Sequence, residues 1–160
     1  MTYALIARCP RTGCLGIAAA SYTMAIGAYC DGALRPNVGA TLTLGAPLVR
    51  NNHLALNALA AGHTPSLALA TLEENDPHFA YRQIGIVDRE GTALAHTGAR
   101  VRHSYGQRIG SGFIAIGSSL AAEEVLDALV ARFEQASQAS PGCRSPSPHS
   151  SHACPAAGQE

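Results

Sequence analysis

Apolar residues near the start of the chain have the spacing of β-strands and are separated by turn residues. Residues 2–8 form a short apolar run of strand-forming residues, and residues 14–21 form a second run. Between the runs, Pro10 presets its φ angle and Gly13 accepts a positive one, as a tight turn requires. This pattern predicts a β-hairpin that begins at residue 2.

Apolar positions recur at helical spacing in two consecutive segments further along. Residues 50–61 predict one helix, which Gly62 would end as the first residue beyond it. Thr64 and Pro65 are typical of the N-cap and first helical position, so a second helix is predicted over residues 64–75.

Strand-like runs fill much of the rest of the chain. Further strands are predicted at residues 37–44, 81–88, 92–97 and 113–116. Asp88 and Gly91 are suited to open and close a tight turn between two of these strands. Residues 22–35 have no pattern that assigns them, and the polar, glycine-rich residues 103–112 predict a loop.

The last helix is predicted after Ser118 or Ser119, either of which can cap it, with Glu123 and Glu124 in its first turns. Its apolar positions are Val125, Leu126, Leu129, Val130 and Phe133. Beyond residue 137 the chain is rich in Ser, Pro and His and has no periodicity. We therefore predict one domain over residues 1–137 and a disordered tail over residues 138–160.

Composition excludes several classes of function. The formal net charge is zero, which argues against a nucleic-acid partner. All 11 basic residues are arginine, so lysine-based chemistry is excluded. The chain shows neither a leader peptide nor an apolar run of the roughly 20 residues that a membrane span needs, which predicts a cytoplasmic protein with no membrane partner. The five cysteines lack the spacing of a zinc site, and we expect neither a metal nor a cofactor.

Several short segments form an ordered set: MTY at 1–3, ARCPRTG at 7–13, LAAG at 59–62, DP at 76–77, YRQ at 81–83, IVD at 86–88 and AHTG at 95–98. This set resembles the bacterial domain-of-unknown-function family 1028, which is placed among the N-terminal-nucleophile hydrolases. The resemblance covers residues 1–137. It implies an α/β (α+β) fold, a four-layer αββα sandwich with two mainly antiparallel sheets.

Three features depart from the family pattern. Leu44 follows Thr43 where relatives commonly have Gln, and Ser118 follows Gly117 where relatives usually have Asn. Relatives also continue for several strands and a helix where this chain has its Ser/Pro/His-rich tail. We therefore expect the second sheet to be incomplete at its C-terminal side and the tail to be a truncation or frameshift remnant.

The resemblance implies that Thr2 is a nucleophile. Removal of Met1 is expected because Thr2 is small, and the exposed α-amine, with a pKa of about 7.7–8.0, can act as the general base. Ser21 and Asp88 are candidate neighbours. For Ser21 the alternative is a strand-end hydroxyl bonded to backbone. For Asp88 the alternative is the turn-opening role given above.

Positive charge and histidines offer weaker candidates. Arg8, Arg35 and Arg82 can supply charge near the nucleophile, although an arginine does not accept a proton. His96 lies on a strand with alternating polar and apolar residues. It either faces the space between the sheets or is a core or edge histidine with no role in the site. The remaining histidines of the helical region are interpreted as solvated: His53, His63 and His78.

The leading hypothesis is hydrolysis of a C–N amide bond by Thr2, with a small-molecule amide or peptide-like substrate. One alternative is a non-catalytic domain of the same fold that binds a small ligand or forms a homo-oligomer. Another is an inactive truncated remnant whose exposed sheet edge promotes association.

Overall fold

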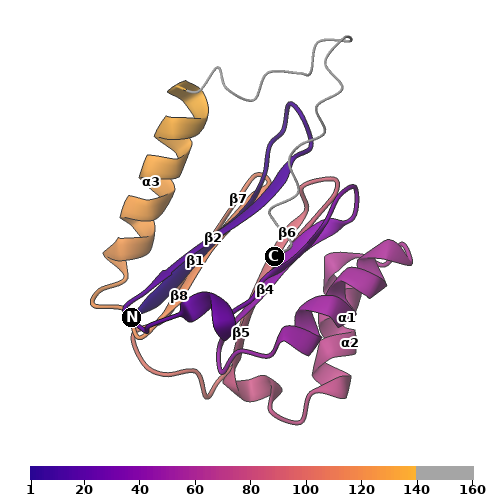
Figure 1. Cartoon of the computed structure of the whole chain (residues 1–160), viewed down its shortest axis with the longest axis horizontal. Helices are drawn as coiled ribbons and strands as arrows, with labels where there is room; N and C mark the ends of the chain where they lie inside the picture. Colours follow the sequence, from indigo (N-terminus) through magenta and orange to yellow (C-terminus); the bar gives the residue numbers. More distant parts are fainter. Residues whose placement is uncertain (140–160) are drawn as a thin grey trace.

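Two antiparallel sheets pack face to face and carry helices on their outer faces (Figure 1). A computed structural model describes residues 1–139, and within them each sheet has four strands. On one side α3 (Glu124–Ala139) covers the first sheet, and on the other α1 (Val49–Ala60) and α2 (Pro65–Asn75) cover the second. This order of layers confirms the predicted α+β sandwich.

The first sheet has the strand order β2-β1-β8-β7, so β1 pairs on both sides. Its strands are β1 (Thr2–Arg8), β2 (Leu15–Ser21), β7 (Gly106–Gly110) and β8 (Phe113–Ser118). The predicted hairpin is confirmed: Thr2 lies opposite Ser21, and Gly13 in the turn has a φ of 73°. On its other side, Thr2 lies opposite Ser118.

The second sheet has the order β3-β4-β5-β6. Its strands are β3 (Ala33–Arg35), β4 (Gly39–Gly45), β5 (Arg82–Asp88) and β6 (Ala93–Thr97). Two short 3-10 turns, η1 (Ile26–Ala28) and η2 (Phe79–Tyr81), lead into β3 and β5. The predicted caps of α2 and α1 are confirmed, because the Thr64 side chain accepts a hydrogen bond from the Leu67 amide at 3.3 Å and Gly62 has a φ of 88°.

The space between the sheets is filled by alternate residues of facing strands. The buried residues there are Ala4, Ile6, Ala40, Leu42, Leu44, Val87, Ile114 and Ile116. Gly85 allows this close approach, because a Cβ atom at that position would lie 2.7 Å from Cδ1 of Ile6. The other residues of β1, such as Tyr3 and Leu5, pack instead on the α3 side. Side chains of β1 therefore alternate between two different apolar layers.

Two sequence predictions of local structure are wrong, and one segment without a prediction forms a strand. Residues 106–110, predicted as loop, form β7; the strand has glycines at both ends, which hides its alternation, and Gly110 leaves room for the Phe113 ring. Part of the unassigned connection forms β3, which is too short to show a period. The last helix begins at Glu124, because Ser118 still belongs to β8 and neither it nor Ser119 caps the helix.

The C-terminal boundary of the domain is partly described. α3 continues past the predicted boundary at residue 137 to Ala139, and the rest of the predicted tail lies outside the described residues.

No helix within residues 1–139 is both long and apolar enough to cross a bilayer.

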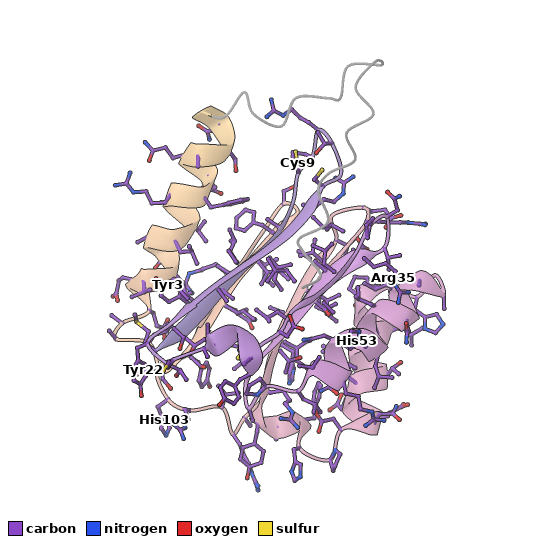
Figure 2. All side chains as sticks on the ribbon, viewed as in Figure 1. Tyr3, Cys9, Tyr22, Arg35, His53 and His103 are labelled. Carbon is purple, nitrogen blue, oxygen red and sulfur yellow. The ribbon has the colours of Figure 1, made fainter. Side chains whose placement is uncertain are left out.

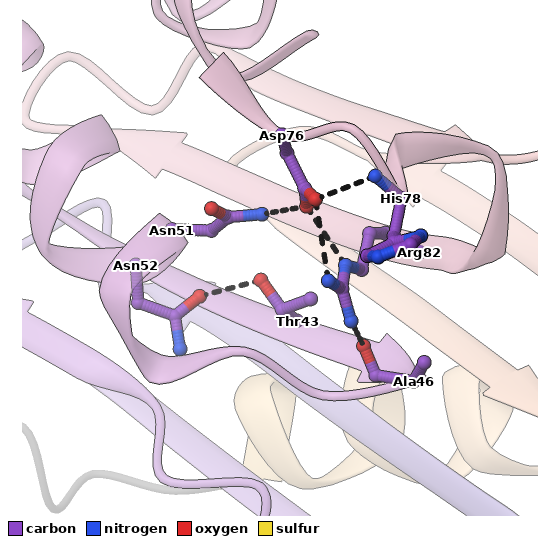
Figure 3. Close-up of polar contacts among 7 residues, drawn as sticks. All are labelled: Thr43, Ala46, Asn51, Asn52, Asp76, His78 and Arg82. Atoms are coloured by element: carbon purple, nitrogen blue, oxygen red, sulfur yellow. Dashed lines mark hydrogen bonds and ion pairs between the residues drawn. The ribbon is translucent and has the colours of Figure 1, made fainter.

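A buried ion pair joins the end of α2 to the start of β5 (Figure 3). Arg82 donates to both carboxylate oxygens of Asp76, at 2.8 and 3.2 Å, and its remaining Nη1 donates to the carbonyl of Ala46. Asp76 also accepts from the Asn51 amide at 2.7 Å and from the backbone N–H of His78 at 2.9 Å. The Arg82 guanidinium, with these further hydrogen bonds, lowers the pKa of Asp76 to about 2.

Replacing Asp76 with Asn should lower the free energy of unfolding by about 3 kcal/mol, because it leaves the Arg82 charge buried without its counterion. The stabilisation from Asp76 is complete above its ordinary pKa of 3.8 and is lost as the pH falls through about 2. Urea unfolding at neutral pH measures the change. Asp127→Asn is the matched control, because Asp127 pairs with Arg108 at the surface and should matter far less. Equal losses in both variants would contradict the assignment.

His96 predicts a second pH effect. Its ring stacks on Phe79 at 4.4 Å, and its buried Nε2 has no hydrogen-bond partner. Burial lowers the pKa of His96 below its ordinary 6.5, so stability is complete above that pH and falls as the pH drops below it. When the pH is lowered from about 7 to about 5, the free energy of unfolding, measured in urea, should therefore fall less for His96→Phe than for the parent. His53→Gln, at an exposed position on α1, should retain the acid response of the parent.

Candidate functional site

Thr2 lies at one end of the sandwich with its side chain on the inter-sheet face of β1. Its hydroxyl is 2.9 Å from the hydroxyl of Ser21 on the neighbouring strand. Ser21 also donates to the carbonyl of Met1 at 3.2 Å and accepts from the backbone N–H of Thr23 at 3.0 Å. The structure therefore brings two of the three predicted site residues together, and Ser21 bonds to backbone at the same time.

Two cavities meet at Thr2. One, of about 410 Å³, has a largely apolar lining that includes Met24, Ile26, Tyr29, Leu44 and Pro47. The other, of about 600 Å³, has a mixed lining whose large polar and basic side chains include Tyr81, Arg100 and Arg102. The residues that line both cavities are Thr2, Thr23, Gly45 and Ser118. Any group held at Thr2 thus borders both an apolar space and a basic space.

Ser118 faces the same space from β8, the other neighbour of β1. Only 7% of Ser118 is exposed, and its hydroxyl makes no hydrogen bond with any residue that the structure describes. Leu44 lines the apolar cavity, and Ser118 lines both cavities. From the sequence, Ser118 or Ser119 was expected to cap the last helix, because the strand before them was predicted to end at residue 116.

Asp88, the third predicted site residue, does not lie near Thr2. It is at the opposite end of β5 from Arg82, where it pairs with Gly39, whereas Gly45 at the other end of β4 lines the Thr2 cavities. Its carboxylate accepts from the backbone N–H groups of Glu90 at 3.0 Å and Thr92 at 2.7 Å. Asp88 therefore holds the turn after β5, which was the alternative interpretation of this residue.

The three arginines considered as nearby charges serve other purposes. Arg82 is buried with Asp76, Arg35 donates to the side chain of Asn57 at 3.1 Å, and Arg8 ends β1 far from Thr2. The basic side chains beside the cavity are instead Arg100 and Arg102. They lie in the irregular connection after β6, where no periodicity distinguishes them in the sequence.

His96, the candidate histidine of the sequence, lies away from this site. His96 faces α2 and η2 rather than the space between the sheets, because it stacks on Phe79. His53 lies on α1, on the outer side of the second sheet, whereas Tyr22 and His103 lie at the same end as the start of β1 (Figure 2). Within the described residues no group of three His, Cys, Asp or Glu side chains is placed to hold a metal ion.

The fold and this geometry define an αββα sandwich with a threonine at one end of the space between its two sheets. The sequence model of the family of unknown function DUF1028 matches residues 2–143, and the chain belongs to that family. The crystal structure of protein SPO2555 from Silicibacter pomeroyi, assigned to the same family, is similar with a TM-score of 0.78 and 30% sequence identity. The similarity covers 83% of this chain but 61% of that one, so this chain spans about three fifths of its length. None of the curated proteins matches this chain.

Cys30 provides a chemical probe of the cavity. It lines the apolar cavity, and burial raises the pKa of its thiol. Alkylation of Cys30 by iodoacetamide should therefore be slower in the folded protein than in urea, and should accelerate as the pH rises. Peptide mapping by mass spectrometry separates Cys30 from the other cysteines. A folded-state rate equal to the rate in urea would contradict the described position of Cys30.

Proposed function

We propose that this protein is an N-terminal-nucleophile hydrolase that cleaves C–N amide bonds with Thr2. The observation that carries the proposal is the placement of the Thr2 hydroxyl, 2.9 Å from the Ser21 hydroxyl, where two cavities meet. The position is held by pairing on both sides, because β1 is an inner strand of its sheet. Such rigidity favours a reacting group that must keep its orientation.

The nucleophile requires removal of Met1. The Met1 carbonyl accepts from the Ser21 hydroxyl at 3.2 Å and from the Tyr22 amide at 3.3 Å. Without Met1, the Ser21 hydroxyl is released from this bond and remains beside Thr2, where it can orient the new α-amine and the Thr2 hydroxyl. The α-amine has an ordinary pKa of about 7.7–8.0, so a useful fraction is neutral at physiological pH.

The reaction proceeds in two steps. The Thr2 oxygen attacks the amide carbon, its proton passes to the α-amine, and collapse of the tetrahedral intermediate breaks the C–N bond as the leaving amine takes that proton. A Thr2 ester of the acyl group remains. Water then attacks this ester, with the amine again as base, and the carboxylic acid is released. One water is consumed for each amide bond that is cleaved.

Ser118 is the proposed donor to the oxyanion of each tetrahedral intermediate. It is nearly buried, lines both cavities, and carries a hydroxyl that is not engaged by the described residues. A donor held in place before the reaction stabilises the developing negative charge without reorganisation. With no lysine in the chain, the amine of Thr2 is the proposed base.

The predicted substrate remains a small-molecule amide or a peptide-like compound. A homo-oligomeric assembly and a cytoplasmic location stay predictions from the sequence. Non-catalytic ligand binding remains the alternative function, and the experiment below separates the two.

Replacement of Thr2 separates the enzyme from a ligand-binding domain. Intact mass should show that Met1 is absent from the parent and from the Thr2→Ala and Thr2→Ser variants, because all three second residues are small. Thr2→Ala should lose amide hydrolysis on the order of 1,000-fold or more in kcat/KM, whereas Thr2→Ser retains a hydroxyl and should retain part of the activity. The kcat/KM of the parent should fall as the pH drops below about 8 and the amine becomes protonated. Retention of Met1 in the active protein, or equal activity of Thr2→Ala, would overturn the proposal.

A further inference from the structure

The lining of the two cavities differs in a way that defines a class of substrate. We infer that the site takes an amide with an apolar group on one side of the scissile bond and an anionic group, a carboxylate or a phosphate, on the other. The inference rests on the proposed function for the position of the scissile bond. The evidence that the two cavities bind an apolar group and an anion does not depend on the proposed function.

The basic cavity contains two arginines without a carboxylate partner. The ion pairs among residues 1–139 are Arg82 with Asp76, Arg89 with Glu90 and Arg108 with Asp127, so Arg100 and Arg102 take part in none. None of the described residues that line either cavity is acidic. Two uncompensated guanidinium groups facing one space attract an anion, and a carboxylate or phosphate matches their planar donors.

The fold anchors the segment that carries these arginines. Arg100 donates to the Tyr81 hydroxyl at 2.9 Å, its guanidinium lies 5.5 Å from the centre of that ring, and its backbone N–H donates to Ala80 at 2.8 Å. Between the two arginines, Val101 is buried and packs near Gly45. The segment approaches η2 so closely that a Cβ atom on Gly98 would lie 2.3 Å from the carbonyl oxygen of Ala80. The two charges are therefore presented by an anchored segment.

The apolar cavity is bordered by large apolar side chains that are left in water. Met24 is 89% exposed and Tyr29 is 62% exposed, and both belong to its lining together with Ile26 and Leu44. Leaving apolar surface in water is unfavourable, and contiguous surface of this kind is typical of binding sites. An acyl or alkyl group of the substrate would cover it.

Three probes that differ in one end test the inference. N-hexanoyl-β-alanine carries a carboxylate, N-hexanoylphosphoethanolamine carries a phosphate, and N-hexanoylbutylamine is uncharged. Hydrolysis is followed by the released amine, and binding is measured by calorimetry on the Thr2→Ala protein. At least one anionic probe should bind about tenfold or more tightly than the uncharged one, and its KM should rise with added NaCl. The two anionic probes distinguish a carboxylate from a phosphate ligand.

Arginine variants locate the anion. Arg100→Gln and Arg102→Gln should each raise KM for the anionic probe about tenfold, with kcat and the KM for the uncharged probe little changed, as expected for uniform binding. An unchanged KM for the uncharged probe also shows that the variant is folded. Arg132→Gln is the control, because Arg132 is exposed on α3 and bonds to Gln135 of the same helix. It should leave all three KM values unchanged.

The outcomes distinguish failure of the inference from failure of the proposed function. If all three probes are hydrolysed with equal kcat/KM, or if neither arginine variant changes KM, the class of substrate is wrong while the hydrolase stands. If the anionic probes bind through Arg100 and Arg102 but no probe is hydrolysed, the binding site stands and the hydrolase is wrong. If no anionic probe binds more tightly than the uncharged one, the inference is overturned.

Discussion

The alternation of side chains along β1 is the constraint on which the candidate site depends. Ala4 and Ile6 are buried between the sheets, while Tyr3 and Leu5 pack on the α3 side. Because the period of a strand is two, this register places Thr2 on the inter-sheet face. A shift of one residue would turn Thr2 toward α3 and exchange the side chains that fill the two apolar layers. Burial of both faces of β1 therefore fixes the orientation of the nucleophile proposed here.

A buried ion pair, and not apolar packing, fixes the chain where β4 ends beside the Thr2 cavities. Around Gly45 and Ala46 the chain leaves β4, and the Arg82 guanidinium bonds both the Asp76 carboxylate and the Ala46 carbonyl. Such a buried pair adds little net stability over an apolar substitute, but losing one member leaves an uncompensated charge. Its effect here is geometric: it ties the end of α2, the start of β5 and the lining of a Thr2 cavity into one unit.

The site combines groups from distant parts of the sequence. Thr2 and Ser21 come from the first hairpin, Ser118 from β8, and Arg100 and Arg102 from the connection after β6. The hydroxyls lie on three adjacent strands of one sheet, and the arginines reach the same space from the edge of the other. This division gives the proposed chemistry to one sheet and the proposed recognition of charge to the other.

Local patterns in the sequence determined the hairpin, α1, α2 and most strands, because turn residues, caps and period-two alternation are properties of neighbouring residues. They also determined that Thr2 and Ser21 meet, since a hairpin pairs its first and last residues. Only the tertiary structure decided that Asp88 lies at the far end, that Arg82 is neutralised by Asp76, and that Ser118, Arg100 and Arg102 surround Thr2. Those relations follow from strand order and from the packing of one sheet on the other, and neither is encoded in any short stretch of residues.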